Sequence, residues 1–433
     1  MKTIKYILIS FLFFFYFSIN AQQRNVDWVH GLNGNTDSWA HYEQIFNTER
    51  NINSLNLNYN TSFSIDYSAN QVRNGVMNHW NDVHNNKNLA IGHSMGGLMI
   101  RDVDRHTSQN DKVFGGYITV CTPNYGAGIA NSVLDGSVQN AAVDAMNKIT
   151  DGPLSQFVLP YTIIPNLTTD IVGNIFINNN VVNHLISNEY PTPIVQDLKQ
   201  GSSTINAINY YTDNYNHNIP RISVWGNETS PVHWQMFSYD LYDNDSDLPH
   251  YMNIARGVYN GAYIVNQALG AACTIAGFLN PWCFVSAANF YYTASQWKKG
   301  RDWFDDSENI WNSLIKATRR EQRDVQVLVF VPDDDYDDCM SYYENEQYPW
   351  PGDCGEWVYQ TETRWVNINY PSDGLIPKYS QIMQNNPTPN SEYEVPNANH
   401  LGIRNMYDSN NGNDIMKSKF DDIFDRYDWF RTN

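Results

Sequence analysis

Between residues 22 and 126, short apolar runs alternate with segments in which apolar residues recur every three or four positions. The runs predict strands, and the spacing of three or four predicts helices. The expected strands are Asn25–Val29, Phe63–Tyr67, Leu89–Gly92 and Gly116–Thr122, and the expected helices are Gln71–His84 and Gly97–His106. Strands that alternate with helices in this way are typical of a parallel sheet with helices on its faces.

Beyond residue 126 the pattern is less regular. Ile222–Gly226 and Val325–Val331 predict further strands, the sheet pattern resumes near Tyr370, Val395–Leu401 predicts the closing strand, and Asp414–Phe430 predicts a terminal amphipathic helix. We therefore expect one domain over residues 22–433. Its core is expected to comprise residues 22–150, 215–235 and 365–433, with insertions at about 150–215 and 235–364.

The most apolar stretch after the first 21 residues is Gly257–Trp297. Asn266, Gln267 and the pair Asn280-Pro281 interrupt it, so it predicts two short packed helices joined near Asn280 rather than a bilayer span. A long insertion often builds a pocket and a lid, and an apolar lid would suit an acyl chain or a lipid interface. Helices that simply pack as core are the alternative.

The first 21 residues have the layout of an export signal. Lys2 and Lys5 precede an apolar run from Ile7 to Ile19, which is short for a membrane span, and Asn20-Ala21 offers a cleavage point. We therefore expect residues 1–21 to be a signal peptide that is cleaved near Ala21, and the mature chain to be secreted to the periplasm or the medium. An uncleaved N-terminal anchor is the alternative.

Charge and cysteine content narrow the picture further. The formal net charge is −19, which argues against nucleic acid and anionic membrane surfaces as partners. In an exported protein, the pairs Cys339–Cys354 and Cys273–Cys283 are expected to form local disulfides, and unpaired core cysteines are the alternative. Cys121 lies in an apolar strand pattern and is expected to be a buried free thiol.

The segment Gly92-His93-Ser94-Met95-Gly96 fits the pattern G-x-S-x-G and stands between an expected strand and an expected helix. A nucleophilic serine at such a turn has a strained backbone, and side chains two residues to either side would collide, so glycines occupy both places. The N-terminus of the following helix adds positive potential and free N–H groups. We expect Ser94 to be a nucleophile, and a purely structural turn is the alternative.

A second motif, Val29-His30-Gly31-Leu32-Asn33-Gly34, ends the first expected strand. Acyl transfer requires preorganised N–H donors for an oxyanion. One donor is expected to be the backbone N–H of Met95, and the other comes from a loop after an early strand, where Leu32 is placed to supply it. His30 is expected to be structural.

A serine nucleophile also needs a base and a group that orients the base. In the chain order Ser, Asp, His, His400 is the histidine that follows a late strand pattern near the C-terminus, and it is the expected base. Asp373 lies in a turn before Gly374 and after an apolar segment, and it is the expected acid. Asp245 and Asp247, which follow an earlier expected strand more closely, are the alternatives.

Five segments together resemble secreted bacterial triacylglycerol lipases and their esterase relatives: Val29–Gly34, Gly92–Leu98, Cys121–Gly126, Ser372–Pro377 and Asn399-His400. The resemblance covers roughly residues 22–126 and 365–405. It implies a compact α/β-hydrolase fold, a mostly parallel sheet flanked by helices that lacks the leading strands and carries a large helical and loop insertion. It also implies a triad of Ser94, Asp373 and His400, with oxyanion donors at Leu32 and Met95.

Two features depart from this family or stand outside it. The family usually has histidine or a similar residue after Thr-Pro, where this chain has Asn124, which we interpret as variation without consequence. The long middle region between Thr-Pro and the acid turn lies outside the resemblance. The acidic run Asp333–Asp338 offers carboxylate oxygens that suit Ca²⁺. Its spacing does not match an EF-hand, so we expect a solvated loop and assign no Ca²⁺ ligands.

The sequence thus predicts a secreted hydrolase of carboxylic esters, a lipase or carboxylesterase that forms an acyl-enzyme on Ser94 and requires no cofactor. Its expected partner is an ester or lipid substrate, with a lipid interface if the apolar helices form a lid. Neither nucleic acid nor a stable membrane span after signal removal is expected. A phospholipase, polyester depolymerase or amidase would fit the same fold, and a non-catalytic binding protein on a hydrolase scaffold is a further alternative.

Overall fold

The computed structural model describes residues 24–80, 88–107, 112–138, 140, 141, 144, 193–214, 219–228, 248–277, 282–332, 355–386, 388–405, 407, 408 and 413–427. The chain forms two compact units, the first made of Met1–Ala317 with Pro371–Asn433 and the second of Thr318–Tyr370. Several predictions lie outside the described residues: the signal peptide, the disulfide Cys339–Cys354, the acidic run Asp333–Asp338, and the alternative acids Asp245 and Asp247.

The centre of the first unit is a six-stranded sheet with the strand order β2-β1-β3-β4-β5-β8. Every neighbouring pair is parallel. The strands are β1 (Asn25–Val29), β2 (Asn53–Leu57), β3 (Asn88–His93), β4 (Gly116–Val120), β5 (Arg221–Asn227) and β8 (Glu392–Pro396). β3 and β4 are buried throughout, whereas the edge strand β8 alternates between exposed and buried residues. The predicted parallel α/β sheet is therefore confirmed.

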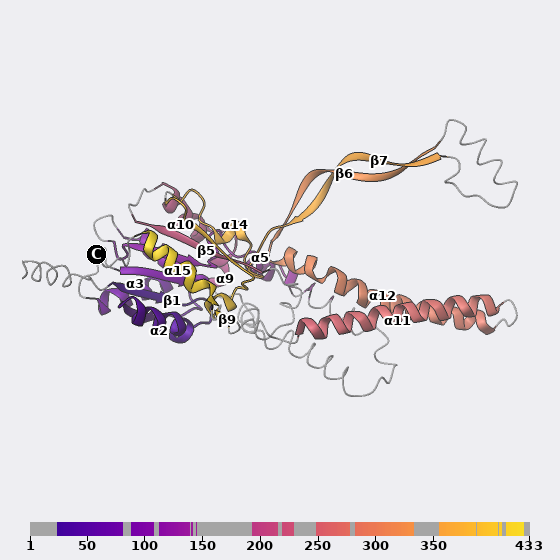
Figure 1. Ribbon diagram of the computed structural model, residues 1–433, viewed down its shortest axis with the longest axis horizontal. Helices are drawn as coiled ribbons and strands as arrows, with labels where there is room; N and C mark the ends of the chain where they lie inside the picture. Colours follow the sequence, from indigo (N-terminus) through magenta and orange to yellow (C-terminus); the bar gives the residue numbers. More distant parts are fainter. Residues whose placement is uncertain are drawn as a thin grey trace, which may run out of the picture. The chain divides into compact units, whose positions relative to one another are not determined.

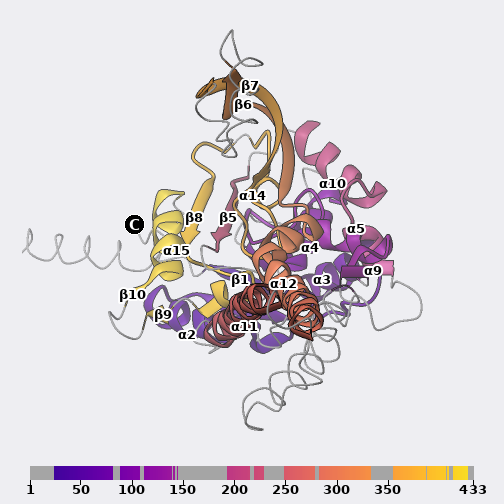
Figure 2. The ribbon, with the colours of Figure 1, turned by 90° about the vertical axis from the view of Figure 1, so that its right-hand side faces the viewer.

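Helices cover both faces of this sheet (Figures 1 and 2). One buried cluster draws on the short helix η1 (Thr36–Trp39), α2 (Ala40–Glu49) and α15 (Ile415–Arg426). The other draws on α3 (Ile65–His79), α4 (Met95–Arg105), α5 (Gly128–Leu134), α9 (Pro193–Leu198) and α10 (Ser203–Asn214). Because successive side chains of a strand point to opposite faces, β1 places Trp28 in the first cluster and Val29 in the second.

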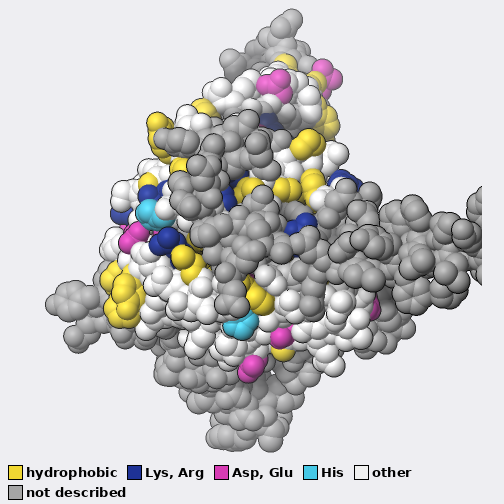
Figure 3. All heavy atoms as spheres, turned by 90° about the vertical axis from the view of Figure 1, so that its left-hand side faces the viewer, with side chains coloured by type: hydrophobic (Ala, Val, Ile, Leu, Met, Phe, Trp, Pro, Cys, Tyr) yellow, Lys and Arg dark blue, Asp and Glu magenta, His cyan; other side chains and the backbone are white. Residues whose placement is uncertain are grey.

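Short elements complete the first unit. They are α14 (Lys378–Gln381), η6 (Gly402–Asn405) and the two-stranded pair β9 (Tyr407–Asp408) and β10 (Asn413–Asp414). On the face drawn in Figure 3, hydrophobic side chains lie in small scattered groups among polar ones. Such scattered groups are ordinary for a protein surface.

Several of the predicted strands are wrong in place or in partner, and the closing strand β8 ends at Pro396 rather than at the predicted Leu401. No strand forms at Phe63–Tyr67, because Ser64 caps a helix there: its hydroxyl accepts a hydrogen bond from the Tyr67 N–H, and α3 begins at Ile65. The main sheet does not resume near Tyr370. Instead, β6 (Thr318–Pro332) and β7 (Gly355–Asn369) pair antiparallel with each other and form the second unit. The predicted strand Val325–Val331 is therefore part of a hairpin rather than of the main sheet.

The apolar stretch of the middle region forms two long helices, α11 (Leu248–Gly277) and α12 (Trp282–Leu314), where two short ones were expected. The C-terminal end of α12 joins the core, because the Trp311 Nε1 donates to the Gly374 carbonyl at 2.7 Å. Among the described residues, no helix is both long and apolar enough to cross a membrane. The predicted Cys273–Cys283 disulfide is wrong, since both residues are free thiols on separate helices.

Candidate active site

Ser94 stands at the sharp turn between β3 and α4, as the sequence pattern predicts. Its backbone has φ of +53° and ψ of −127°, a strained conformation for a residue with a side chain. A Cβ on Gly92 would lie 2.6 Å from the backbone of Gly96, so only glycine fits at that position. The Ser94 N–H donates to the Val120 carbonyl at 2.8 Å and thereby ties the turn to β4.

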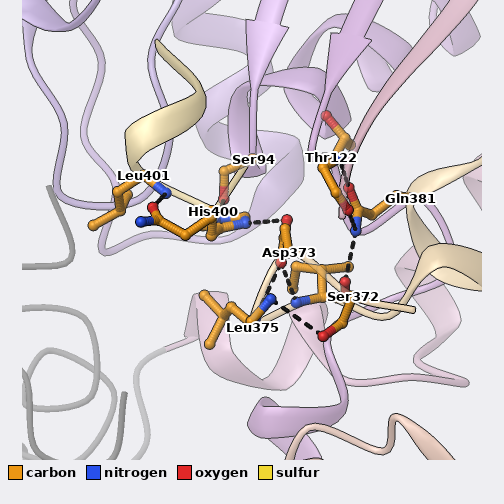
Figure 4. Close-up of polar contacts among 12 residues, drawn as sticks. Ser94, Thr122, Ser372, Asp373, Leu375, Gln381, His400 and Leu401 are labelled. Carbon is orange, nitrogen blue, oxygen red and sulfur yellow. Dashed lines mark hydrogen bonds and ion pairs between the residues drawn. The ribbon is translucent and has the colours of Figure 1, made fainter. Parts of the chain in front are cut away.

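The structure brings Ser94, His400 and Asp373 into one chain of hydrogen bonds (Figure 4). The Nε2 of His400 lies 2.9 Å from the Ser94 hydroxyl, and the Nδ1 lies 2.7 Å from Oδ2 of Asp373. His400 and Asp373 are buried. A carboxylate accepts hydrogen bonds, so the proton of a neutral His400 belongs on Nδ1, which leaves Nε2 free to accept the hydroxyl proton.

Asp373 is held in place by the turn that carries it. Its Oδ1 accepts from the N–H groups of Leu375 and Ile376, at 3.0 and 2.7 Å, so that Oδ2 is left for the histidine. Gly374 has φ of +84°, a conformation that favours glycine and that lets the chain turn back over the carboxylate. The Asp373 carbonyl also accepts from the His400 N–H at 2.8 Å. The acid and the base are thus fixed to each other through backbone as well as side chains.

Cys121 lies beside this carboxylate. It is buried and free, and its Sγ lies within 4.8 Å of the nearest ligand atoms of Asp373 and His400. Burial raises the pKa of the Cys121 thiol well above its usual value, and the negative charge of Asp373 raises it further. Cys121 therefore stays protonated and adds no second negative charge beside the acid.

The loop after β1 packs directly against the serine. A Cβ on Gly31 would lie 2.8 Å from the Ser94 Cβ, so the loop can approach only because residue 31 is glycine. The Tyr59 hydroxyl donates to the His30 carbonyl at 2.6 Å, and its ring stacks on the imidazole at 4.4 Å. His30 is buried and structural in this arrangement. Leu32 and Met95 line the same pocket as Ser94, and their role as oxyanion donors stays a prediction.

The pocket beside Ser94 is largely apolar. It contains about 510 Å³ of empty space, including solvent at its mouth. Its polar lining consists of His93, Ser94 and His400, and its other lining residues are Leu32, Met95, Pro123, Ala127, Ile129, Ala130, Leu198, Leu375, Ile376 and Leu401. A few polar groups at one place in an apolar cavity are typical of a site that binds an apolar substrate and reacts with it at that place.

Sequence reasoning missed the part played by His93. Its Nε2 lies 2.7 Å from the carbonyl oxygen of His400, and a carbonyl can only accept, so Nε2 carries a proton. Burial lowers the pKa of the His93 imidazole well below its usual value, with a further lowering from the charge of Arg404, so the ring is neutral. A histidine directly before the nucleophile was a visible signal, but only the fold shows that it supports the base.

A second missed feature is the buried polar network around Gln381, which is drawn in part in Figure 4. Its side chain accepts from the Gly226 N–H at 2.9 Å and donates to the Ile376 carbonyl at 2.7 Å, and so it links β5 to the acid turn. Asn124 donates to the Gln381 carbonyl at 2.7 Å and accepts from Arg101 at 3.0 Å. The asparagine that departs from the lipase pattern is therefore part of the support for the acid turn.

Two groups of potential metal ligands occur among the described residues. The first is Cys121 with Asp373 and His400, whose hydrogen bonds are given above. The second consists of Asp66, Asp102 and His106. In it, Asp102 already pairs with Arg105 at 2.8 Å. Neither group has the many oxygen ligands that Ca²⁺ takes, so we assign no metal ligand.

Comparison with known proteins gives similarity at the level of solved structures alone. No protein-family model and no curated protein match the chain. Phospholipase PlaB from Legionella pneumophila is similar over 52% of this chain and 42% of that chain, with 14% identity and a TM-score of 0.32. The mature Bacillus licheniformis lipase BlEst2 is similar over 48% of this chain and 66% of that one, with 15% identity and a TM-score of 0.28. The chain thus spans less than half of the phospholipase's length.

The chain's own geometry defines its class. The parallel sheet, the serine at the turn after β3, and an aspartate and a histidine that follow it in that order are the features of the α/β-hydrolase fold. The predicted fold class is confirmed.

Proposed function

We propose that this protein is a secreted serine hydrolase that cleaves carboxylic esters, as a lipase or carboxylesterase, through an acyl-enzyme on Ser94. The observation that supports the proposal is the unbroken chain of hydrogen bonds from the Ser94 hydroxyl through His400 to Asp373. Each of these side chains has the partner that nucleophilic acyl transfer requires of it.

In the proposed mechanism, the Ser94 oxygen attacks the ester carbonyl while His400 Nε2 takes its proton. The backbone N–H groups of Leu32 and Met95 stabilise the oxyanion. Asp373 stabilises the imidazolium, which then gives its proton to the leaving alcohol as the carbon–oxygen bond breaks. Water, activated by the same Nε2, releases the acid and restores Ser94. The reaction needs no organic cofactor.

The lining of the pocket favours an acyl chain as the group that is bound. The side chains around Ser94 are mostly aliphatic, among them Ile129, Leu198 and Ile376. The described lining residues include no lysine, arginine, aspartate or glutamate that could pair with an ionic acyl group. Burial of methylene groups on these side chains is favourable by about 0.8 kcal/mol each. Turnover of p-nitrophenyl esters should therefore rise with acyl length. The same series with and without an emulsion separates a lipase from a carboxylesterase.

The direct test is the variant Ser94→Ala. It should retain the fold, as measured by circular dichroism, and lose ester hydrolysis by at least about a thousandfold, because the nucleophile is absent. A fluorophosphonate probe should label the natural protein and Ser137→Ala, but not Ser94→Ala. Labelling that persists in Ser94→Ala, or unchanged turnover, would refute the proposal.

Export is part of the same proposal. Expression in a bacterium, followed by N-terminal sequencing of the protein found outside the cytoplasm, should give a chain that begins at Gln22. A chain that keeps Met1 and stays with the cells would contradict export.

A further inference from the structure

The helix pair α11 and α12 contains a long segment without charge. From Gly257 to Trp297 there is no aspartate, glutamate, lysine, arginine or histidine, although 17% of the chain's residues are charged. Arg256 precedes this charge-free segment, and Lys298 follows it. A helix pair that projects only into water usually carries charged residues on its outer faces.

The two helices pack closely against each other through small residues. A Cβ on Gly270 would lie 2.7 Å from the Tyr291 ring, and one on Gly300 would clash with the Tyr259 ring. Ala287 and Ala294 are buried. Small residues let two helices approach closely and are common where helix pairs are surrounded by lipid.

Apolar side chains remain on the outside of this pair. Six of them are between 38% and 68% exposed: Ile264, Val265, Leu269, Val285, Tyr291 and Tyr292. They come from both helices, and all six lie within the charge-free segment. Concentrated exposure of this kind marks a surface that contacts another apolar phase or molecule.

Several polar side chains in the charge-free segment bond to their own helix. Asn266 donates to the Ala262 carbonyl at 2.8 Å, Thr274 to the Gly270 carbonyl at 2.8 Å, and Ser295 to the Tyr292 carbonyl at 2.6 Å. A polar group that is satisfied within its own helix needs no water. These residues therefore do not prevent the segment from entering an apolar environment.

Basic residues follow the charge-free segment on α12. Lys298, Lys299 and Arg301 come directly after it, and the Arg301 guanidinium lies 4.5 Å from the centre of the Tyr263 ring. Aromatic residues next to lysine and arginine are typical of the level at which lipid headgroups meet hydrocarbon. The charge-free part of α12 is roughly 24 Å long at 1.5 Å per residue, less than the roughly 30 Å of a bilayer's hydrocarbon.

We propose that the described part of the charge-free segment, residues 257–277 of α11 and 282–297 of α12, docks onto the surface of a phospholipid bilayer with zwitterionic headgroups. Apolar burial drives the docking, and the net charge of −19 disfavours anionic lipid. The docking does not depend on the chemistry of Ser94. The end of α12 contacts the acid turn through the hydrogen bond from Trp311 to the Gly374 carbonyl. If the proposed ester hydrolysis holds, docking would therefore bring the active site to a membrane and make lipid esters the substrate class.

Flotation of the full chain with phosphatidylcholine vesicles tests the docking. The protein carries Ser94→Ala throughout, so that binding is read without turnover, and residues 1–21 are the same in every variant. Val265→Asp with Val285→Asp should lower the partition coefficient at least about tenfold, because a charged side chain is costly in hydrocarbon. The matched control, Met77→Asp with Tyr210→Asp, adds the same charge at exposed helical positions elsewhere and should bind as before.

A second measurement does not depend on the folding of the variants. A polarity-sensitive dye is attached to the free thiols of Cys273 and Cys283. Its fluorescence emission should shift to the blue when vesicles are added, and the shift should persist in 0.5 M NaCl. As a control, protein in which serine replaces both Cys273 and Cys283 is treated with the same dye, and its emission measures the contribution of dye attached at other positions. Absence of vesicle binding, equal binding by both double variants, or loss of binding in salt would overturn the proposal. A dimer that only the Val265/Val285 variant breaks, without vesicle binding, would assign the surface to a second copy.

Discussion

At the scale of single residues, the site depends on buried groups that support one another. His93 donates to the backbone of His400, and two N–H groups hold the Asp373 carboxylate. Asp27 in β1 is also buried, but within the described part of the chain its carboxylate accepts from the Trp80 Nε1 at 2.8 Å and its Oδ2 has no hydrogen-bond partner. Partners decide whether a buried polar group stabilises the fold or is a cost to it.

Replacement of His93 should affect the base. His93→Leu leaves the His400 carbonyl without its donor, which should cost about 1–3 kcal/mol in the free energy of unfolding. It should also lower kcat for ester hydrolysis more than it raises KM. His93→Gln can place an amide N–H near the position of Nε2 and should restore much of kcat. Equal kcat values for the two variants would show that the hydrogen bond has no positioning role.

Asp27 should make stability depend on pH. Burial raises the pKa of its carboxyl to about 7, against a smaller lowering by the Trp80 hydrogen bond. The unfolded chain loses this proton near pH 4, so between about pH 4 and 7 the native state binds more protons, and stability falls as pH rises. Asp27→Asn removes this loss. The free energy of unfolding of Asp27→Asn, measured with urea, should therefore exceed that of the natural protein by an amount that grows as pH rises. The growth should be up to about 1.4 kcal/mol per pH unit and should level off above pH 7.

The partner of Asp27 offers a second variant. Trp80→Phe removes a hydrogen bond that favours the ionised carboxylate, so the pKa of Asp27 should rise further and the pH window should extend upward. An Asp27→Asn advantage that is the same at pH 5 and pH 8 would contradict this assignment.

At the scale of elements, the sequence predicted the buried strands β3 and β4 on either side of the serine. It missed the edge strand β2 and assigned the wrong partner to the strand at Val325–Val331. β3 and β4 were predictable because both are buried and read as apolar runs. β2 was missed because it lies at a sheet edge and because polar residues interrupt its apolar ones within Asn53–Leu57. The hairpin of β6 and β7 was misread because a local pattern does not say with which strand it pairs.

The site could be read from the sequence to a similar extent. The serine, aspartate and histidine occupy short motifs in a fixed order, and the fold brings them together. Gln381 and Asn124 could not be found, because their contacts join residues 257 apart in the chain. The predicted Cys273–Cys283 bond failed for a related reason: nearness in sequence does not set the distance between two helices.

The cap of α3 provides a test at this scale. Ser64→Ala removes the acceptor for the Tyr67 N–H and should lower the free energy of unfolding by about 0.5–2 kcal/mol. Asn70→Ala, at an exposed position within the same helix, raises helix propensity and should not destabilise. Urea unfolding of both variants makes the comparison. An unchanged Ser64→Ala would indicate that α3 does not depend on this cap.

At the scale of the whole molecule, the chain forms two units that differ in how they are stabilised. The first has two large buried clusters on either side of its sheet. The second is a two-stranded hairpin, in which Leu328, Tyr359 and Trp365 are exposed. An isolated pair of strands contributes little stability by itself.

Removal of the hairpin should therefore leave the first unit folded. Thr318 lies opposite Asn369 in the antiparallel register, so a short glycine linker can replace Thr318–Tyr370 and join Ala317 to Pro371. The shortened protein should melt within a few degrees of the full chain and retain turnover of a short p-nitrophenyl ester. A collapse of the melting transition would show that the first unit needs the hairpin in order to fold.

The position of the acid and the base along the chain also bears on when activity can arise during synthesis. Five of the six sheet strands and the serine precede residue 317, whereas the aspartate and the histidine follow residue 370. When the ribosome has translated residues 1–317, the nascent chain contains Ser94 but neither the base nor the acid that would activate it. Under the proposed mechanism, hydrolytic competence is the last property that the growing polypeptide acquires, and premature termination before residue 400 yields an inert product.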